Sequence, residues 1–308
     1  MSILMVPPAE YQRIHLVFHP NSGKGLGARR VAELETLLFS LGLRPRRLDT
    51  SKISGSELGE ALGQADAVVV IGGDGLIHHV ITHLARTRTP MGIVPAGSGN
   101  DTWRMSSART VEQTIQNIAR FLTGGIEAKP VDLLELKFAN QDSQAKLAIG
   151  AVSWGFEGLV NGRANKLPRS LGALRYLVGL VLSLPKLQAR RTVVHSEEFD
   201  FRGQVYAASI ANIRSLGGGI TLFPQADYTD GLADISLVSG NRLIKVLPYV
   251  GHILSGRKHP YREIARSSQV NVQTAEASYA DGELLGRGDF ELSVLQHALS
   301  LIPGADSR

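Results

Sequence analysis

The stretch whose residue types could most directly do chemistry is Gly72–Gly75 (GGDG), which follows the apolar run Ala67–Ile71 and precedes Leu76–Leu84. The short β-branched run predicts a buried strand, and the run after the glycines predicts a helix. In a strand, glycine loop and helix unit, bare backbone N–H groups and the positive end of the helix attract a phosphate. Asp74 could orient a phosphate-bound cation or a ribose hydroxyl. Taken alone, this stretch is equally consistent with a glycine turn that binds nothing.

Two further glycine-bearing loops also follow expected strands. His19–Gly25 (HPNSGKG) follows Ile14–Phe18, and Pro95–Asp101 (PAGSGND) follows Met91–Val94. Other expected elements are a strand at Arg46–Thr50 and helices at Ser56–Leu62, at Val111–Leu122 and over Val31, Leu34, Leu37, Leu38 and Leu41, the last ending at Gly42. Strands that alternate with helices predict a parallel, doubly wound sheet. All three loops would then converge at the carboxyl edge of the sheet, where such sheets bind ligands.

The pattern changes after Lys129, with a domain break expected near residues 126–130. Strands with few helices between them are expected at Val131–Phe138, Lys146–Val152, Arg191–His195, Gln204–Asn212 and Asp234–Val238. This pattern predicts a second, β-rich domain of two packed sheets. The apolar stretch Leu171–Leu187 is the exception and predicts a helix.

Composition limits the class of protein. The 308 residues are 43% hydrophobic and 20% charged, and they include no cysteine, which excludes disulfides and thiolate metal sites and fits a reducing compartment. Met1–Glu10 lacks the apolar core of a secretory signal, and Leu171–Leu187 is short for a bilayer span and contains Arg175 and Pro185. We therefore expect a cytoplasmic protein, with peripheral attachment to the inner face of the membrane left open.

The formal charge of +5 favours an anionic partner, either a nucleotide or an anionic lipid surface. The basic residues form three clusters: Arg44, Arg46 and Arg47; Lys186, Arg190 and Arg191; and Arg257, Lys258, Arg262 and Arg266. Any one cluster is also explained as a solvated face. Aromatic residues are only 6% of the chain and do not interleave with the basic ones, which disfavours nucleic acid.

Six segments in order carry a resemblance to a known family. They are His19–Gly25, Gly72–Leu76 (GGDGL), Pro95–Asp101, Ala211–Pro224 (ANIRSLGGGITLFP), Asp227–Asp234 (DYTDGLAD) and Ala280–Glu283 (ADGE). Together they resemble the diacylglycerol kinase catalytic-domain family, which includes bacterial diacylglycerol kinase-like and sphingosine kinase-like lipid kinases. NAD kinases share the GGDG loop but not the later segments.

The resemblance implies an architecture and a reaction. The fold class would be α/β plus β, with a three-layer α/β domain like that of phosphofructokinases and NAD kinases at residues 1–128 and a β-sandwich domain at 129–289. The segment at about 290–308 would return to the first domain, and ATP would bind in the cleft between the domains. The reaction would be Mg²⁺-dependent transfer of the ATP γ-phosphoryl group to a lipid hydroxyl, and a homodimer is left open.

The resemblance also implies roles for individual residues. ATP would be bound by Asn21, Ser22, Gly23, Thr50, Gly72, Gly73, Asp74, Gly75, Ser98, Asn100 and Asp101, with Lys24 as a further phosphate partner. Glu283 would accept the proton of the lipid hydroxyl, with Asp281 binding Mg²⁺ or holding the acceptor. Asp227, Asp230 and the carbonyl of Leu232 would hold a structural Mg²⁺.

From the residues alone, several of these stretches have simpler explanations. Asn100 and Asp101 are good helix caps, Thr229-Asp230-Gly231 is good turn chemistry, and Asp281–Glu283 fits a hairpin turn.

One position departs from the family pattern. Leu76 stands where the family's GGDGT loop has threonine, and loss of that hydroxyl is expected to cost about 1 kcal/mol. Leu76 thereby supports one alternative to a lipid kinase, a regulatory protein that binds nucleotide or lipid without efficient turnover. A second alternative is a kinase of the same fold for a soluble acceptor such as NAD, which the C-terminal segments disfavour.

Overall fold

The computed structural model divides the chain into two compact units. The N-terminal unit comprises residues 1–131 with 298–308, and the C-terminal unit comprises residues 132–297. The structure describes residues 11–304 except 141–144, 157–159, 161, 164–165, 169–170, 172–177, 180–181, 184–186, 241–242, 250 and 253–254. Among the described residues, no helix combines the length and apolar character needed to cross a bilayer.

The N-terminal unit is a parallel sheet flanked by helices. Its elements are β1 (Ile14–Phe18), α1 (Leu26–Ser40), β2 (Arg46–Asp49), α2 (Gly55–Gly63), β3 (Ala67–Gly72), α3 (Asp74–Leu84), β4 (Pro90–Pro95), α4 (Asp101–Met105) and α5 (Val111–Leu122). The strand order is β15-β4-β3-β1-β2, and every pair in it is parallel. The last residues of β15 (Phe290–Leu301) join this sheet, because Ser300 pairs with Pro90 and Leu301 with Met91.

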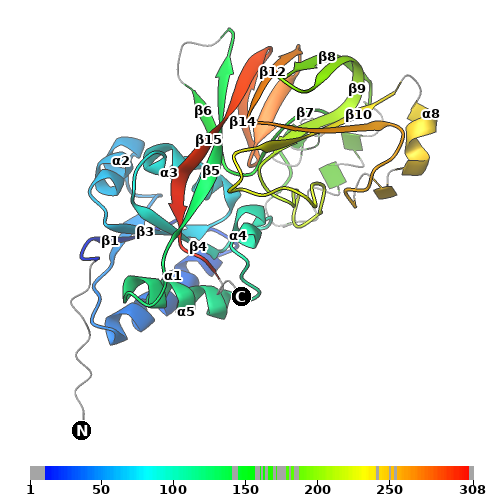
Figure 1. Ribbon diagram of the computed structural model, residues 1–308. Helices are drawn as coiled ribbons and strands as arrows, with labels where there is room; N and C mark the ends of the chain where they lie inside the picture. Colours follow the sequence, from blue (N-terminus) through cyan, green and yellow to red (C-terminus); the bar gives the residue numbers. More distant parts are fainter. Residues whose placement is uncertain are drawn as a thin grey trace. The chain divides into compact units, whose positions relative to one another are not determined.

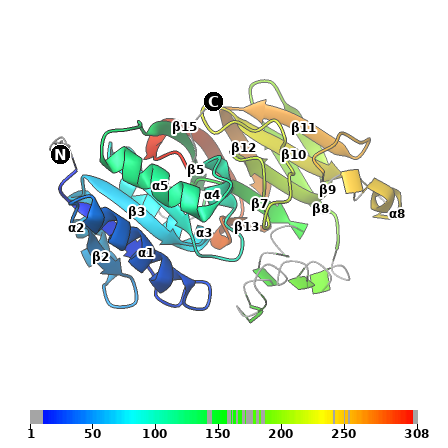
Figure 2. The same cartoon turned by 90° about the horizontal axis from the view of Figure 1, so that it is seen from below.

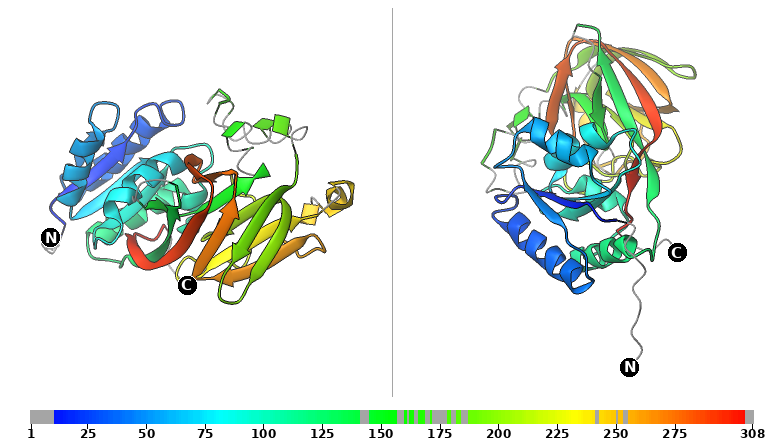
Figure 3. Two further views of the ribbon diagram at one scale, coloured as in Figure 1. Left: turned by 90° about the horizontal axis from the view of Figure 1, so that it is seen from above. Right: turned by 90° about the vertical axis from the view of Figure 1, so that its left-hand side faces the viewer.

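Alternation along the strands explains why helices cover both faces of this sheet. In β3, Ala67, Val69 and Ile71 pack in one cluster with side chains of α1 and α5. Val68 and Val70 point to the other face and are fully buried. Figures 1 and 3 show α1 and α5 on one side of the sheet and α2 and α3 on the other, and Figure 2 shows the sheet from the α1 and α5 side. The unit therefore has three layers.

Two of these helices begin at side chains that cap them. The Ser54 hydroxyl accepts a hydrogen bond from Glu57 N at 3.2 Å, and the Glu57 carboxylate accepts from Ser54 N at 2.7 Å. This capping box fixes the start of α2. The Thr110 hydroxyl accepts from Gln113 N at 3.1 Å and starts α5.

Most of the strands and helices that can be assigned among the described residues of the C-terminal unit are strands. Its elements are β5 (Lys129–Phe138), β6 (Lys146–Ala148), β7 (Ala151–Gly155), β8 (Arg190–His195), β9 (Asp200–Ala211), β10 (Ala233–Ser239), α8 (Leu243–Val246), η3 (Leu247–Tyr249), β11 (Arg262–Ser267), β12 (Gln269–Thr274), β13 (Ala277–Ala280), β14 (Glu283–Arg287) and most of β15. The first half of β9 pairs with β8, and its second half pairs with β7 and β10. Because β9 changes partners along its length, it links these strands to one another. Among the described residues of this unit, the buried side chains form one large core and two smaller clusters.

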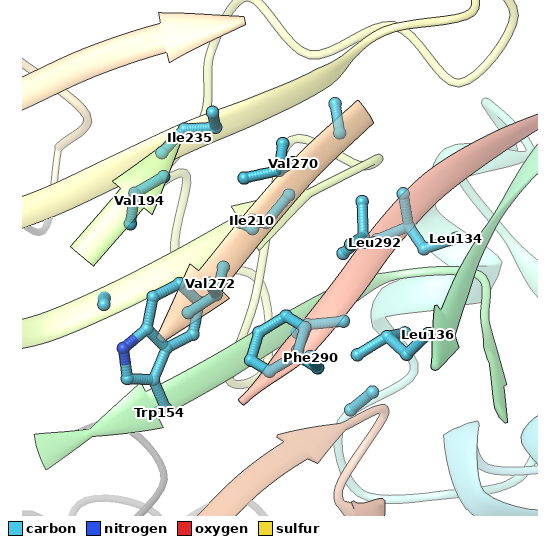
Figure 4. Close-up of a cluster of buried hydrophobic side chains, with 14 of the residues drawn as sticks. Leu134, Leu136, Trp154, Val194, Ile210, Ile235, Val270, Val272, Phe290 and Leu292 are labelled. Carbon is cyan, nitrogen blue, oxygen red and sulfur yellow. The ribbon is translucent and has the colours of Figure 1, made fainter. Parts of the chain in front are cut away.

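Large side chains from the two ends of the C-terminal unit's sequence meet in that core. The rings of Trp154 and Phe290 lie edge to face with their centroids 5.6 Å apart, and Phe138 lies 5.5 Å from Phe290. Val194, Ile210, Ile235 and Val272 belong to the same core, which Figure 4 shows, and Trp154 is fully buried. Burying a side chain of this size stabilises the unit by about 2–3 kcal/mol.

Two expectations differ from this fold in detail. The single strand expected at Lys146–Val152 is two strands, β6 and β7, because the chain turns at Ile149 and Gly150. The helix expected at Leu171–Leu187 falls largely on residues outside those that the structure describes.

Candidate functional site

The three glycine loops of the N-terminal unit touch one another through their backbones. A Cβ placed on Gly97 would lie 2.4 Å from the Cα of Gly73, and a Cβ on Gly23 would lie 2.4 Å from the Ala96 carbonyl oxygen. Ala96 N also donates a hydrogen bond to the Gly72 carbonyl at 2.8 Å. No side chain fits at these contacts, so glycine is required at both positions. The expected convergence at the carboxyl ends of β1, β3 and β4 is present.

Asp74 fastens the second loop to the third. Its Oδ1 accepts a hydrogen bond from Thr102 N at 3.0 Å, in the first turn of α4. Its Oδ2 faces Gly99, where an added Cβ would lie 2.8 Å away. The carboxylate thus caps a helix 28 positions later in the chain.

Asn100 has a different role from the expected helix cap. It adopts φ +56°, and its side chain makes no capping bond to α4. Its Oδ1 instead accepts from Gly97 N at 2.9 Å, while its Nδ2 donates to the Gly97 carbonyl at 3.0 Å. This closed pair of bonds fixes the loop around Ser98. Asp101 pairs with Arg104, whose guanidinium also donates to the Gly99 carbonyl.

The first loop is tight and polar. Ser22 N donates to the His19 carbonyl at 3.0 Å, and Asn21 N donates to His19 Nδ1 at 3.2 Å. Gly23, Lys24 and Gly25 all have positive φ and lead directly into α1. Asn21 and Lys24 are exposed, so their side chains are accessible to a ligand.

Thr50 closes the neighbouring strand. Its backbone N–H and its hydroxyl both donate to the Phe18 carbonyl, at 2.9 and 3.1 Å. The Thr50 hydroxyl therefore already donates its proton to the last residue of β1, so toward a ligand its oxygen can only accept a hydrogen bond.

Leu76 lies in the first turn of α3 and folds back over the loop. If a Cβ were added to Gly72, it would lie 2.7 Å from the Cδ2 atom of Leu76. Leu76 N donates to the Gly73 carbonyl at 3.0 Å, so its backbone donor is used inside the turn. An apolar side chain thus covers the backbone where the family places a hydroxyl.

In the C-terminal unit, Asp281 and Gly282 form the two-residue turn between β13 and β14. Both have positive φ, at +52° and +89°, as the Asp-Gly pair in a tight hairpin favours. The Asp281 carboxylate accepts hydrogen bonds from Ile149 N at 3.1 Å and from Gly150 N at 2.9 Å. Glu283, the first residue of β14, is exposed, and its carboxylate has no hydrogen bond or ion pair within the described residues.

A buried polar network, which the sequence analysis missed, connects this hairpin to the loop at 227–232. Asn212, only 1% exposed, donates from Nδ2 to the carbonyls of Asp132 at 2.7 Å and Ile149 at 3.2 Å. The fully buried Asp132 carboxylate accepts from Gly231 N and His297 N, both at 2.7 Å. The available signal was the presence of two carboxylates, Asp132 and Glu135, among the apolar residues of β5, since a buried charge requires partners.

In the loop that the resemblance assigns to a structural Mg²⁺, the two carboxylates accept hydrogen bonds from the backbone of the loop itself. Asp227 Oδ1 accepts from Thr229 N at 3.0 Å, and Asp230 Oδ1 accepts from Leu232 N at 3.0 Å. Asp230 Oδ2 forms an ion pair with Arg266. Both expected carboxylates thus also have partners within the protein, and the Mg²⁺ site of Asp227, Asp230 and the Leu232 carbonyl stays a prediction. Among the described residues, no group of three or more His, Cys, Asp or Glu side chains could hold a metal ion.

Comparison with known proteins covers both units. Residues 13–135 match the model of the diacylglycerol kinase catalytic domain, and residues 150–303 match the YegS C-terminal NAD kinase beta sandwich-like domain. A diacylglycerol kinase of Mycobacterium tuberculosis is 30% identical over 274 residues, which cover 84% of this chain and 86% of that protein. The chain belongs to the diacylglycerol kinase and YegS lipid kinase family.

Two further proteins are similar to this chain, one in sequence and one in fold. A probable lipid kinase YegS of Escherichia coli is 27% identical over 238 residues, 75% of this chain and 76% of its own. A crystal structure of a putative diacylglycerol kinase from Bacillus anthracis has a TM-score of 0.78 and 18% identity, covering 96% of this chain and 99% of that one. The expected fold class, α/β followed by an NAD kinase-like β-sandwich, is confirmed. The chain therefore belongs to a family of phosphotransferases, and membership of this family implies ATP as a substrate.

Proposed function

We propose that this protein is an ATP-dependent lipid kinase that transfers the γ-phosphoryl group of Mg²⁺-ATP to the hydroxyl of a diacylglycerol-like lipid. The observation that carries the proposal is the direct backbone contact between Gly73 and Gly97, which holds the glycine loops after β3 and β4 together beside the N-terminus of α3, where a helix favours an anion. Family membership supplies the reaction class.

The nucleotide-binding half of the proposal rests on the three loops. Backbone N–H groups of Gly72, Gly73 and Gly75 would contact the phosphates, and Asp74 would hold the loops in place through Thr102. Ser98 would donate its hydroxyl, because the Asn100–Gly97 bonds fix its backbone. Further ATP contacts are proposed from Asn21, Ser22, Gly23, Thr50, Asn100 and Asp101.

The acceptor half of the proposal rests on the hairpin. Glu283 accepts the proton of the lipid hydroxyl while the oxygen of that hydroxyl forms a bond to the γ-phosphorus of ATP. The bond between the γ-phosphorus and the β–γ bridging oxygen breaks, and ADP is released. The exposed, unpaired carboxylate is suited to this role. Asp281 acts indirectly, because its bonds to Ile149 and Gly150 fix the turn that presents Glu283.

Two further elements belong to this proposal. Mg²⁺ enters bound to ATP as part of the substrate, and it neutralises phosphate charge. The lipid acceptor places the reaction at a membrane surface, which the net charge of +5 would favour if the lipid is anionic.

The test is transfer of label from γ-labelled ATP. Purified protein with Mg²⁺ is offered dioleoylglycerol or sphingosine in mixed micelles and, separately, NAD in water. Label in the organic phase with a lipid acceptor, and none in NAD, is the expected result. Labelled NAD would establish the soluble-acceptor alternative. Tight ATP binding with no labelled product from any acceptor would establish the regulatory alternative, and either result would overturn the proposal.

A further inference from the structure

A positively charged side chain from β11 reaches the loop at 227–232, where the family resemblance implies a bound metal. Arg266 lies on β11 directly opposite Asp234 of β10. Its guanidinium forms an ion pair with Asp230 Oδ2, and its Nε donates to Asp234 Oδ2 at 3.3 Å. One guanidinium therefore connects the loop to the start of β10.

This arrangement is partly buried and geometrically fixed. The side chain of Asp234 is 5% exposed, that of Asp230 29% and that of Arg266 37%. Burial raises the pKa of Asp234, and the nearby Arg266 opposes that rise. The planar, multiply donating guanidinium suits two carboxylates at once.

The remaining loop atoms are already ordered by hydrogen bonds within the protein. Asp227 and Asp230 each use Oδ1 to accept from a backbone N–H two residues later. Gly231, at φ +75°, donates its N–H to Asp132 at 2.7 Å. A Mg²⁺ ion at this loop would have to displace the guanidinium from Asp230 and would then lie beside a cation.

We infer that Arg266 is the resident cation of the loop at 227–232 and replaces the structural Mg²⁺ that the resemblance implies. The loop is then ordered without a divalent metal, and Mg²⁺ is needed only with the nucleotide. This inference does not rest on the proposed lipid kinase activity, because its test omits both nucleotide and lipid.

The test combines metal binding with unfolding of the full-length chain. Mn²⁺ is titrated into metal-free protein, and bound Mn²⁺ is counted by electron paramagnetic resonance. Thermal unfolding is followed by the fluorescence of Trp154 in a Trp103→Phe background, with and without Mg²⁺. The variants are Arg266→Gln, Arg266→Lys, Asp230→Asn and, as the control for loss of one positive charge, Lys258→Gln.

We expect wild type to show no Mn²⁺ site that depends on Asp230, and its Tm to be unaffected by Mg²⁺. Arg266→Gln should lower the Tm by about 2–4 °C, gain Mn²⁺ affinity at least tenfold, and recover stability when Mg²⁺ is added. Arg266→Lys should resemble wild type in metal binding, and Lys258→Gln should change neither quantity.

Two results would overturn the inference. One is a Mn²⁺ site in wild type that Asp230→Asn removes. The other is an Arg266→Gln variant that is as stable as wild type and binds no Mn²⁺, because the loop would then need no cation. If Arg266→Gln does not fold, the wild-type and Asp230→Asn titrations decide alone.

Discussion

At the scale of single residues, Leu76 is the departure most open to test. Its side chain covers Gly72 in the first turn of α3 and offers no hydroxyl to a phosphate. We predict that Leu76→Thr tightens ATP binding about fivefold, which corresponds to about 1 kcal/mol for one hydrogen bond. Isothermal titration calorimetry with Mg²⁺-ATP measures the dissociation constant.

Leu76→Val is the matched control, because valine has the shape of threonine without its hydroxyl. Valine should leave the affinity near that of wild type. Equal effects of threonine and valine would show that side-chain size, rather than a hydroxyl, limits binding.

At the scale of elements, the contact between the β3 and β4 loops determines whether a phosphate site exists. In Gly97→Ala the new Cβ would lie 2.4 Å from the Cα of Gly73 and 2.9 Å from Asn100 Oδ1. The loops must separate, so we predict a loss of about 1–3 kcal/mol in stability and at least tenfold weaker ATP binding. Denaturant unfolding and calorimetry measure the two effects.

The control is Gly63→Ala, because a Cβ on this glycine of α2 would meet nothing within 4 Å. It should be neutral or slightly stabilising. A Gly97→Ala protein with wild-type stability and ATP affinity would contradict the site described above.

The junction of β1 and β3 supplies a pH prediction. Arg13 and the backbone N–H groups of Arg13 and Gln12 bind the Asp66 carboxylate and lower its pKa to about 2. A carboxyl group whose pKa is lower in the folded state stabilises the fold above its unfolded pKa of about 4, and this stability is lost as pH falls toward 2. Stability measured at pH 2–5 should therefore fall less steeply in Asp66→Asn than in wild type.

The expected difference is small, because the Arg13 side chain is 61% exposed and solvent screens the pair. Glu60→Gln, at an exposed carboxylate of α2, should retain the wild-type pH dependence. If the stability of wild type and of Asp66→Asn fell equally as the pH was lowered, the Asp66 carboxylate would not stabilise the folded state in the way predicted.

The sequence could predict elements that are determined by neighbouring residues, but not those that are fixed by residues far apart in the chain. The helix expected at Val111–Leu122 coincides with α5, because its apolar periodicity and its Thr110 cap are both local signals. The turn at Ile149 and Gly150 could not be predicted, since it is fixed by Asp281, 131 positions after Gly150. For the same reason the pairing of Asn212 with Asp132 was not predicted.

At the scale of the whole molecule, not all of the basic residues are available to an anionic surface. In the cluster expected at 257–266, Arg262 is buried and donates to Ser236 and to the Leu222 carbonyl, and Arg266 pairs with Asp230. The net charge of the sequence includes these two guanidinium groups, but in the fold both are bound to other groups of the protein. Arg257 and Lys258 remain exposed.

Arg257 and Lys258 shortly precede Tyr261 in the sequence, and the ring centroids of Tyr261 and Tyr249 are 5.6 Å apart. Basic and tyrosine side chains together suit an anionic membrane surface. We predict that the protein sediments with phosphatidylglycerol vesicles at low salt and that Arg257→Gln with Lys258→Gln weakens binding about thirtyfold, or about 1 kcal/mol per charge. Arg29→Gln with Arg109→Gln is the control, and equal losses in both double variants would assign binding to net charge alone.

The central claim is phosphoryl transfer to a lipid with Glu283 as the base, and single-turnover transfer of label to dioleoylglycerol tests it most directly. Glu283→Gln keeps the size of the side chain but cannot accept the proton, so its rate should fall by about 10²–10⁴-fold with ATP affinity unchanged. Glu276→Gln should transfer at the wild-type rate. A Glu283→Gln protein that phosphorylates the lipid as fast as wild type would contradict the account.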